Sequence, residues 1–124
     1  MKVFDLHIDL SSFCLTSGRK DISKRRNLGK FFLPNQVDIP RLKEGKVKVF
    51  MANVCPILAT PKGFEMPTSS KDEALRQIKF YQKIKPLMDR DKISILISIE
   101  GAYFIEKRDD LELLSKLKKM GVVS

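Results

Sequence analysis

The segment that most constrains the fold is the stretch 93–101, ISILISIEG, which alternates with a strict period of two. Because successive side chains of a β-strand point to opposite faces, its four isoleucines share one face, and Glu100 lies on the other face with Ser94, Leu96 and Ser98. β-Branched residues favour strands. Glu100 ends this strand just before Gly101. An unpaired carboxylate is costly to bury, so this position favours contact with a cation or water.

A second strand is predicted at residues 3–10, VFDLHIDL, and it holds the only histidine of the chain. Strand alternation predicts a polar face and an apolar face, and the apolar face is expected to pack on helices. The polar face holds Val3, Asp5, His7 and Asp9, and the apolar face holds Phe4, Leu6, Ile8 and Leu10. An imidazole and a carboxylate two residues apart can reach one divalent ion from a rigid backbone. The motif alone is too short to establish metal hydrolase chemistry, and a lone histidine is more often structural.

The rest of the chain alternates between helical and strand patterns. The stretch 11–34 is polar and basic, which predicts a loop with one short helix, and 56–67 is predicted to be an irregular loop. Asp38, Pro40 and Gly45 are the expected cap, first-turn residue and end of a short helix. Longer helices are expected at 70–87, with an apolar stripe through Tyr81, and from about 109 to 121. Strands are expected at 47–54 and from residue 122 onward.

The expected stripe of the 70–87 helix comprises Leu75, Ile78, Tyr81, Ile84 and Leu87, and that of the last helix comprises Leu111, Leu114, Leu117 and Met120.

Strands that alternate with helices predict parallel βαβ units. A closed (β/α)8 barrel typically needs about 250 residues, so the 124 residues correspond to about three βα units and the start of a fourth strand. We therefore expect residues 1–124 to form a single partial domain of such a barrel. In this arrangement His7, Asp9 and Glu100 end parallel strands and lie at the same rim.

Composition narrows the function classes. The net charge of +9 comes from 24 Lys and Arg against 15 Asp and Glu, and it is concentrated at residues 19–30. This charge permits nucleic-acid binding, but no nucleic-acid motif accompanies it, so a solvated basic surface is the favoured interpretation. No apolar run is long enough to span a membrane. Asp5, His7 and Asp9 interrupt any signal-peptide core. The distant Cys14 and Cys55 are expected to be free thiols of a reducing, cytoplasmic protein, although pairing is also possible.

Three separated blocks resemble the membrane (renal-type) dipeptidases, the zinc peptidases of the amidohydrolase superfamily. The block 4–10, FDLHIDL, is similar to the family's Asp-Gly-His-x-Asp-Leu opening, and 37–45, VDIPRLKEG, is similar to Thr-Asp-Ile-Pro-Arg-Leu-Arg-Glu-Gly. The third block, IEG at 99–101 with the leucines and MGV that follow it, resembles Glu-Gly-Gly-His and the helix and Leu-Gly-Val-Arg after it. The blocks occur in the family's order over nearly the whole chain.

The resemblance implies a (β/α)8 barrel with two zinc ions at its carboxyl-terminal rim. His7 and Asp9 correspond to ligands of one zinc, and Glu100 corresponds to the carboxylate that bridges both. The implied reaction is hydrolysis of a dipeptide by a metal-activated hydroxide. The family's other histidine ligands, its substrate-binding histidine and its later arginine and aspartate would lie beyond Ser124. From its deeper place on the same strand face, Asp5 is expected to hydrogen-bond near the site or at the base of the barrel.

The sequence also departs from the family pattern. Leu6 replaces a glycine, Tyr103 stands where the family has a histidine, and Asn53 and Cys55 occupy a strand end that is usually more aromatic. No catalytic residue beyond the metal ligands is expected within these residues, and the isolated chain is expected to be inactive. The alternative function is therefore an inactive fragment or subunit that self-associates or binds a partner chain through an open strand edge.

Overall fold

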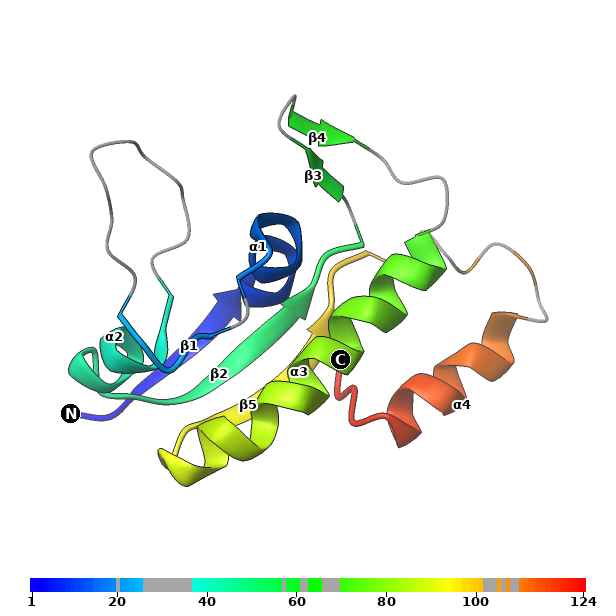
Figure 1. Ribbon diagram of the computed structural model, residues 1–124. Helices are drawn as coiled ribbons and strands as arrows, with labels where there is room; N and C mark the ends of the chain where they lie inside the picture. Colours follow the sequence, from blue (N-terminus) through cyan, green and yellow to red (C-terminus); the bar gives the residue numbers. More distant parts are fainter. Residues whose placement is uncertain are drawn as a thin grey trace.

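The computed structural model describes residues 1–19, 21–25, 37–56, 58–60, 63–65, 70–101, 105, 107 and 110–124. The described part is a mixed α/β structure with one parallel sheet (Figure 1). In chain order its elements are β1 Val3–Ile8, α1 Leu10–Ser17, α2 Ile39–Glu44, β2 Val47–Val54, β3 Leu58–Thr60, β4 Gly63–Glu65, α3 Ser70–Arg90, β5 Ser94–Ile99 and α4 Leu111–Lys119.

The parallel sheet has the strand order β1-β2-β5. β2 and β5 pair without a register shift from Val49–Ser94 to Val54–Ile99. A parallel bridge joins Ile97 to Val122, and the Val123 N–H donates to the Ile97 carbonyl at 2.9 Å. Residues 122–124 therefore continue the sheet beyond β5, which confirms the predicted start of a further strand.

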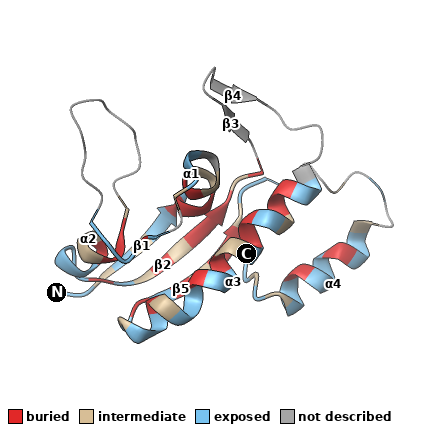
Figure 2. Cartoon of the chain, in the orientation of Figure 1, coloured by how far each residue is buried: buried red, intermediate tan, exposed pale blue. Residues whose placement is uncertain are grey.

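The core lies between the sheet and helices α1 and α3 (Figure 2). Phe50, Ala52 and Val54 of β2 are fully buried, as are Ile78 and Tyr81 of α3. This burial confirms the central part of the stripe that was predicted for the long helix. Burial of such apolar side chains removes about 25 cal/mol of unfavourable hydration free energy per Å² and is the main force that holds the helices on the sheet.

Two predicted apolar faces are wrong in detail. On α4 the buried leucines are Leu113 and Leu117, four residues apart, whereas Leu111 and Leu114 remain about half exposed. Leucines occupy several rows of this helix, so periodicity alone did not identify the row that joins the core. On β1 the side chains of Phe4 and Leu6 are exposed, although the alternation predicted that both would pack on helices.

A register shift explains the error on β1. Asp5 aligns with Phe50 and Ile8 aligns with Ala52, so three residue steps on β1 match two on β2. This β-bulge ends the strict alternation on which the predicted faces rested. Phe4, which follows a further register shift after Val3, aligns with the half-buried Val49, while Ile8 shares the buried face of Ala52.

The strand predicted at residues 3–10 also ends earlier than expected. Leu10 already begins α1, and Gly18, with φ of 66°, ends that helix in the left-handed region. The short helix expected within the basic stretch is therefore present at its start, while residues 26–34 of that stretch lie outside the described residues. The loop expected at 56–67 contains a short antiparallel pair, β3 and β4, that the turn residues did not reveal.

Helix α2 has the predicted ends. The Asp38 carboxylate is fully buried and accepts from the Arg41 N–H at 2.9 Å, which satisfies one of the free donors of the first turn. Pro40 lies in that first turn, and Gly45 follows the last residue. The carboxylate also pairs with the Arg41 side chain, so the helix start is fixed beside the sheet by charge-assisted contacts.

The buried Tyr81 side chain of α3 joins the ends of β1 and β2 to the start of α1. The Tyr81 hydroxyl donates to the Asn53 carbonyl at 2.9 Å or the Ile8 carbonyl at 3.2 Å, and it accepts from the Ser11 N–H at 3.1 Å. Next to it, the Gln77 side chain binds the Ser11 hydroxyl at 3.0 Å and the Cys55 carbonyl at 2.6 Å. These bonds satisfy backbone groups where β1 and β2 leave the sheet ladder.

We expect Tyr81→Phe to lower the free energy of unfolding by about 1–3 kcal/mol, because the buried backbone groups lose a partner that water cannot replace. Burial raises the pKa of Tyr81 above its ordinary value of 10.0. The folded state therefore holds this proton more tightly, and the corresponding stability is present below pH 10 and falls as the pH rises further. Urea unfolding from pH 7 to 11 should show a steeper alkaline loss in the wild type than in Tyr81→Phe. Equal free energies of unfolding in the two proteins, with the same dependence on pH, would contradict this role of Tyr81.

Candidate metal centre

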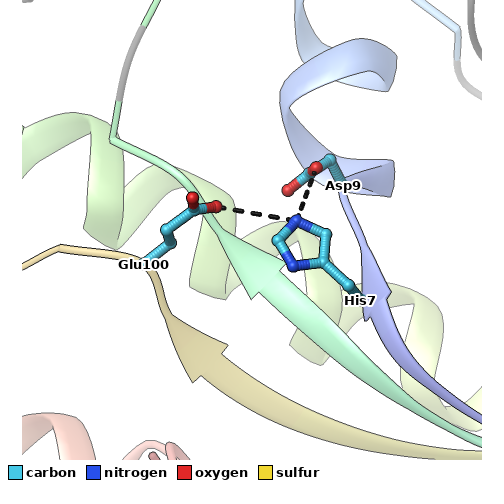
Figure 3. Close-up of side chains that lie close together, drawn as sticks. All are labelled: His7, Asp9 and Glu100. Atoms are coloured by element: carbon cyan, nitrogen blue, oxygen red, sulfur yellow. Dashed lines mark hydrogen bonds and ion pairs between the residues drawn. The ribbon is translucent and has the colours of Figure 1, made fainter.

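His7, Asp9 and Glu100 meet at the carboxyl ends of β1 and β5 (Figure 3). His7 is near the end of β1, Asp9 follows that strand, and Glu100 follows β5. Because parallel strands end at the same edge of a sheet, residues far apart in sequence become neighbours there. His7 Nε2 lies 3.1 Å from Asp9 Oδ2 and 3.6 Å from Glu100 Oε2. The structure thus brings together all three residues that the sequence singled out.

The local backbone directs two of these side chains into the cluster. Asp9 occupies the N-cap position of α1, yet its carboxylate makes no capping hydrogen bond and contacts His7 instead. An aspartate at this position normally stabilises the helix by about 1 kcal/mol through such a bond. Gly101, directly after Glu100, has φ of 79°, a conformation that side chains disfavour. The Glu100 N–H is held by the Val54 carbonyl at 2.9 Å.

The electrostatics of the cluster favour a cation. The side chains of His7, Asp9 and Glu100 are 55%, 47% and 54% exposed, so they are accessible to an ion from solvent. Within the described part of the chain, the ion pairs formed by Asp9 and Glu100 are both with His7. Two carboxylates therefore lie next to one imidazole in a chain whose net charge is +9. A divalent ion among them would offset the mutual repulsion of the carboxylates.

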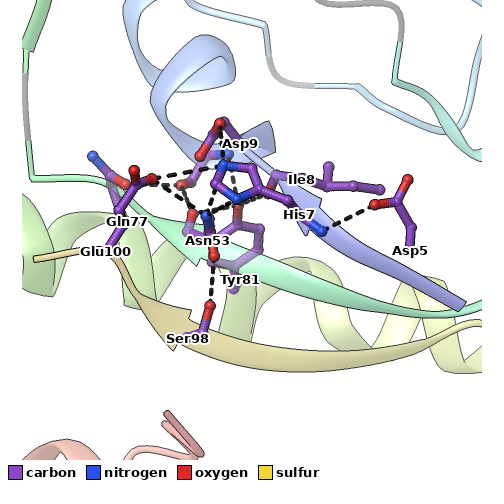
Figure 4. Close-up of polar contacts among 10 residues, drawn as sticks. Asp5, His7, Ile8, Asp9, Asn53, Gln77, Tyr81, Ser98 and Glu100 are labelled. Atoms are coloured by element: carbon purple, nitrogen blue, oxygen red, sulfur yellow. Dashed lines mark hydrogen bonds and ion pairs between the residues drawn. The ribbon is translucent and has the colours of Figure 1, made fainter.

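A second group of polar side chains supports the cluster from the sheet (Figure 4). Asn53 of β2 is 6% exposed, and its Nδ2 lies 2.9 Å from His7 Nδ1, 2.8 Å from His7 Nε2 and 3.3 Å from Glu100 Oε2. The Ser98 hydroxyl donates to Asn53 Oδ1 at 2.5 Å. As expected, Asp5 bonds near the site, since its carboxylate accepts from the His7 N–H at 3.0 Å.

In the sequence, Asn53 is recognisable only as a departure from a family pattern, and it was not predicted to belong to the site. The signal was present in the strand register, because Asn53 aligns with Ser98, two residues before Glu100 on the next strand. Aligned residues of neighbouring strands share a face of the sheet. The offset between the 47–54 and 93–101 strands was not predictable from either strand alone.

The donor set fits zinc. One imidazole nitrogen and two carboxylate oxygens lie within 4.8 Å of one another. Catalytic zinc sites use histidine nitrogen and carboxylate oxygen as ligands and leave a position for water or substrate. The two thiols are not part of this group: Cys14 is buried and Cys55 is half-buried, and no disulfide joins them, as predicted. Tyr103, which stands at the position of a family histidine, lies outside the described residues.

A comparison with solved structures supports the fold. The chain is similar to the crystal structure of the dipeptidase AC, a metallo peptidase of family M19, with a TM-score of 0.66 and 20% sequence identity. The similarity covers 98% of this chain and 41% of the dipeptidase chain. No family model matches the sequence, and no curated protein matches it. At this identity the likeness shows a shared fold, and this chain spans less than half of its structural neighbour.

The described residues include no helix that has both the length and the apolar character needed to cross a membrane.

Proposed function

We propose that this chain is the N-terminal part of a zinc-dependent dipeptidase built on a (β/α)8 barrel. The observation that carries the proposal is the convergence of His7, Asp9 and Glu100 from two strands on a fold shared with a metallo dipeptidase. The strand order β1-β2-β5, continued by residues 122–124, is that of consecutive strands in a parallel barrel. Active sites of such barrels lie at the carboxyl ends of the strands, where this cluster is found.

In this proposal the three side chains would hold zinc in the complete enzyme, which would contain two zinc ions. A bound zinc ion supplies a Lewis acid and makes water a nucleophile near neutral pH, which is the chemistry required to cleave the peptide bond of a dipeptide. His7 would supply a ring nitrogen, while Asp9 and Glu100 would supply carboxylate oxygens. The half-exposed position of all three leaves access for water and substrate.

We expect the purified chain to bind zinc, and we expect His7→Ala to lower its zinc affinity at least about tenfold, because one of few ligands is lost. Isothermal titration calorimetry measures the zinc dissociation constants of the wild type and of His7→Ala. In the full-length enzyme the same substitution should abolish dipeptide hydrolysis.

The matched control is Asp89→Asn, which removes an exposed carboxylate of α3 that pairs with Lys85, and it should bind zinc like the wild type. A Cys55→Ser variant tests binding at the half-buried thiol, and it should also retain affinity. Unchanged zinc affinity in His7→Ala, or dipeptide hydrolysis retained by the full-length variant, would contradict the proposal.

A second candidate function is association with a partner chain or a second copy. Its specific support is on β1, where Phe4 and Leu6 are 52% and 72% exposed on a strand that pairs on one side only in the described sheet. An exposed apolar edge strand is a template for pairing with another chain. In a complete barrel this edge would be covered by the last strand, so the dipeptidase proposal accounts for the same feature.

Light scattering coupled to gel filtration tests the association function. The association function predicts a dimer or larger species at micromolar concentration, and Leu6→Lys, which places a charge on the edge, should shift it toward the monomer. Lys48→Glu, on the exposed side of β2, is the control and should have no such effect. A wild-type chain that remains monomeric and a Leu6→Lys variant of identical mass would count against association.

A further inference from the structure

The β-bulge in β1 lies directly before the candidate metal centre. Asp5 aligns with Phe50 and Ile8 aligns with Ala52, so this stretch of β1 contains one residue more than β2. We infer that Asp5 is a positioning residue, which holds the bulge through a hydrogen bond to the His7 backbone and thereby keeps the His7 side chain in the metal centre. The structural role of Asp5 stands on the strand pairing and this bond, whereas its consequence for metal binding rests on the function proposed above.

The strand register shows what the extra residue does. Counted from the Asp5 pair, a regular strand would align His7 with Ala52. Ala52 is fully buried, so this register would direct the imidazole into the core. With the extra residue, Ile8 takes the buried position instead and is 4% exposed. The bulge therefore keeps the imidazole out of the core and places an apolar side chain there.

The contacts of His7 show that its ring lies on the other face of the sheet. His7 Nε2 is 2.8 Å from Asn53 Nδ2 and 3.6 Å from Glu100 Oε2. Asn53 directly follows Ala52 on β2, and successive side chains of a strand point to opposite faces. A regular strand would align Ile8 with Asn53, so an apolar side chain would face the cluster in place of the imidazole.

Asp5 gives a partner to a backbone N–H of the bulge. The extra residue of a bulge interrupts the regular ladder between the strands. The Asp5 carboxylate accepts from the His7 N–H at 3.0 Å (Figure 4). This bond spans two residues and closes a local turn around Leu6, whose side chain is 72% exposed. The burial of Ile8 fixes where the bulge ends, and the Asp5 bond fixes the path of the chain up to His7.

The same bond limits the conformations that are open to His7. Its side chain is 55% exposed, so it is held less firmly by packing than a buried side chain is. Ordering a residue on ligand binding costs conformational entropy. A backbone that is already held at His7 lowers the entropy cost of bringing the imidazole to the same ion as Asp9 and Glu100.

Two substitutions separate the acceptor of Asp5 from its charge. Asp5→Ala removes the acceptor, and Asp5→Asn keeps an amide oxygen but removes the charge. Because the role of Asp5 is to accept from the His7 N–H, Asp5→Ala should bind zinc about tenfold more weakly than the wild type, and Asp5→Asn should bind it with nearly wild-type affinity. A ligand role for Asp5, or a charge that attracts the ion, predicts equal losses in the two variants, and that result would overturn the inference.

The single histidine makes the bond itself measurable. In protein with ¹⁵N-labelled histidine, the backbone amide spectrum contains one signal, that of His7. Its hydrogen exchange should be slow in the wild type and in Asp5→Asn, and about tenfold faster in Asp5→Ala, because the bond to Asp5 is lost. Leu6 and His7, whose side chains set the intrinsic exchange rate of this amide, are unchanged. A well-dispersed spectrum of uniformly labelled protein verifies the fold of each variant.

The matched control is Asp21→Ala, which removes the same kind of contact outside the strand. The Asp21 carboxylate accepts from the Ser23 N–H at 2.9 Å, again two residues further along the chain. This variant should leave both the zinc affinity and the exchange of the His7 N–H unchanged.

The measurements test the bond and the metal site separately. A wild-type His7 N–H that exchanges as fast as an unstructured amide would overturn the role of Asp5 in holding the bulge. Equal zinc affinities in Asp5→Ala and the wild type would overturn its positioning role toward the metal. A wild-type chain that binds no zinc would contradict the proposed dipeptidase site, while the exchange measurement would still decide whether Asp5 holds the bulge.

Discussion

The Tyr81 hydroxyl is the contact on which the arrangement of the strand ends depends. It meets backbone groups of Ile8, Ser11 and Asn53, so β1, α1 and β2 are joined at one buried point contributed by α3. Apolar packing holds α3 on the sheet but does not specify how far each strand extends before it turns. Hydrogen bonds are directional, and an unmet buried backbone group costs about 1–3 kcal/mol, so this contact sets the level at which the strands end.

The candidate metal centre lies next to the strand ends that Tyr81 fixes. His7 precedes Ile8 and Asp9 follows it, and the Asn53 whose carbonyl binds Tyr81 also directs its amide toward His7. Regular secondary structure is interrupted at the site: β1 contains a bulge before Ile8, and the Asp9 side chain makes no capping hydrogen bond to α1. Such departures reduce local stability, and they are common at functional sites because the side chains are directed toward a ligand instead.

Much of this arrangement was predictable from the sequence. Period-two alternation identified β5, a continuous apolar run identified β2, and Asp38, Pro40 and Gly45 marked α2. Parallel strands also implied that His7, Asp9 and Glu100 would meet. What was missed depends on contacts between elements. The bulge that exposes Phe4 and Leu6 appears only in the pairing of β1 with β2, and the Asn53–Ser98 contact appears only once the register of β2 against β5 is known. The choice of the Leu113–Leu117 row on α4 was likewise decided by packing.

The central claim is that the ends of β1 and β5 form one metal centre. Crystals of the chain grown with zinc, with diffraction data collected on both sides of the zinc absorption edge, test it most directly. We expect an anomalous peak in contact with a ring nitrogen of His7 and with carboxylate oxygens of Asp9 and Glu100. Zinc bound elsewhere on the chain, with no peak among these three side chains, would contradict it.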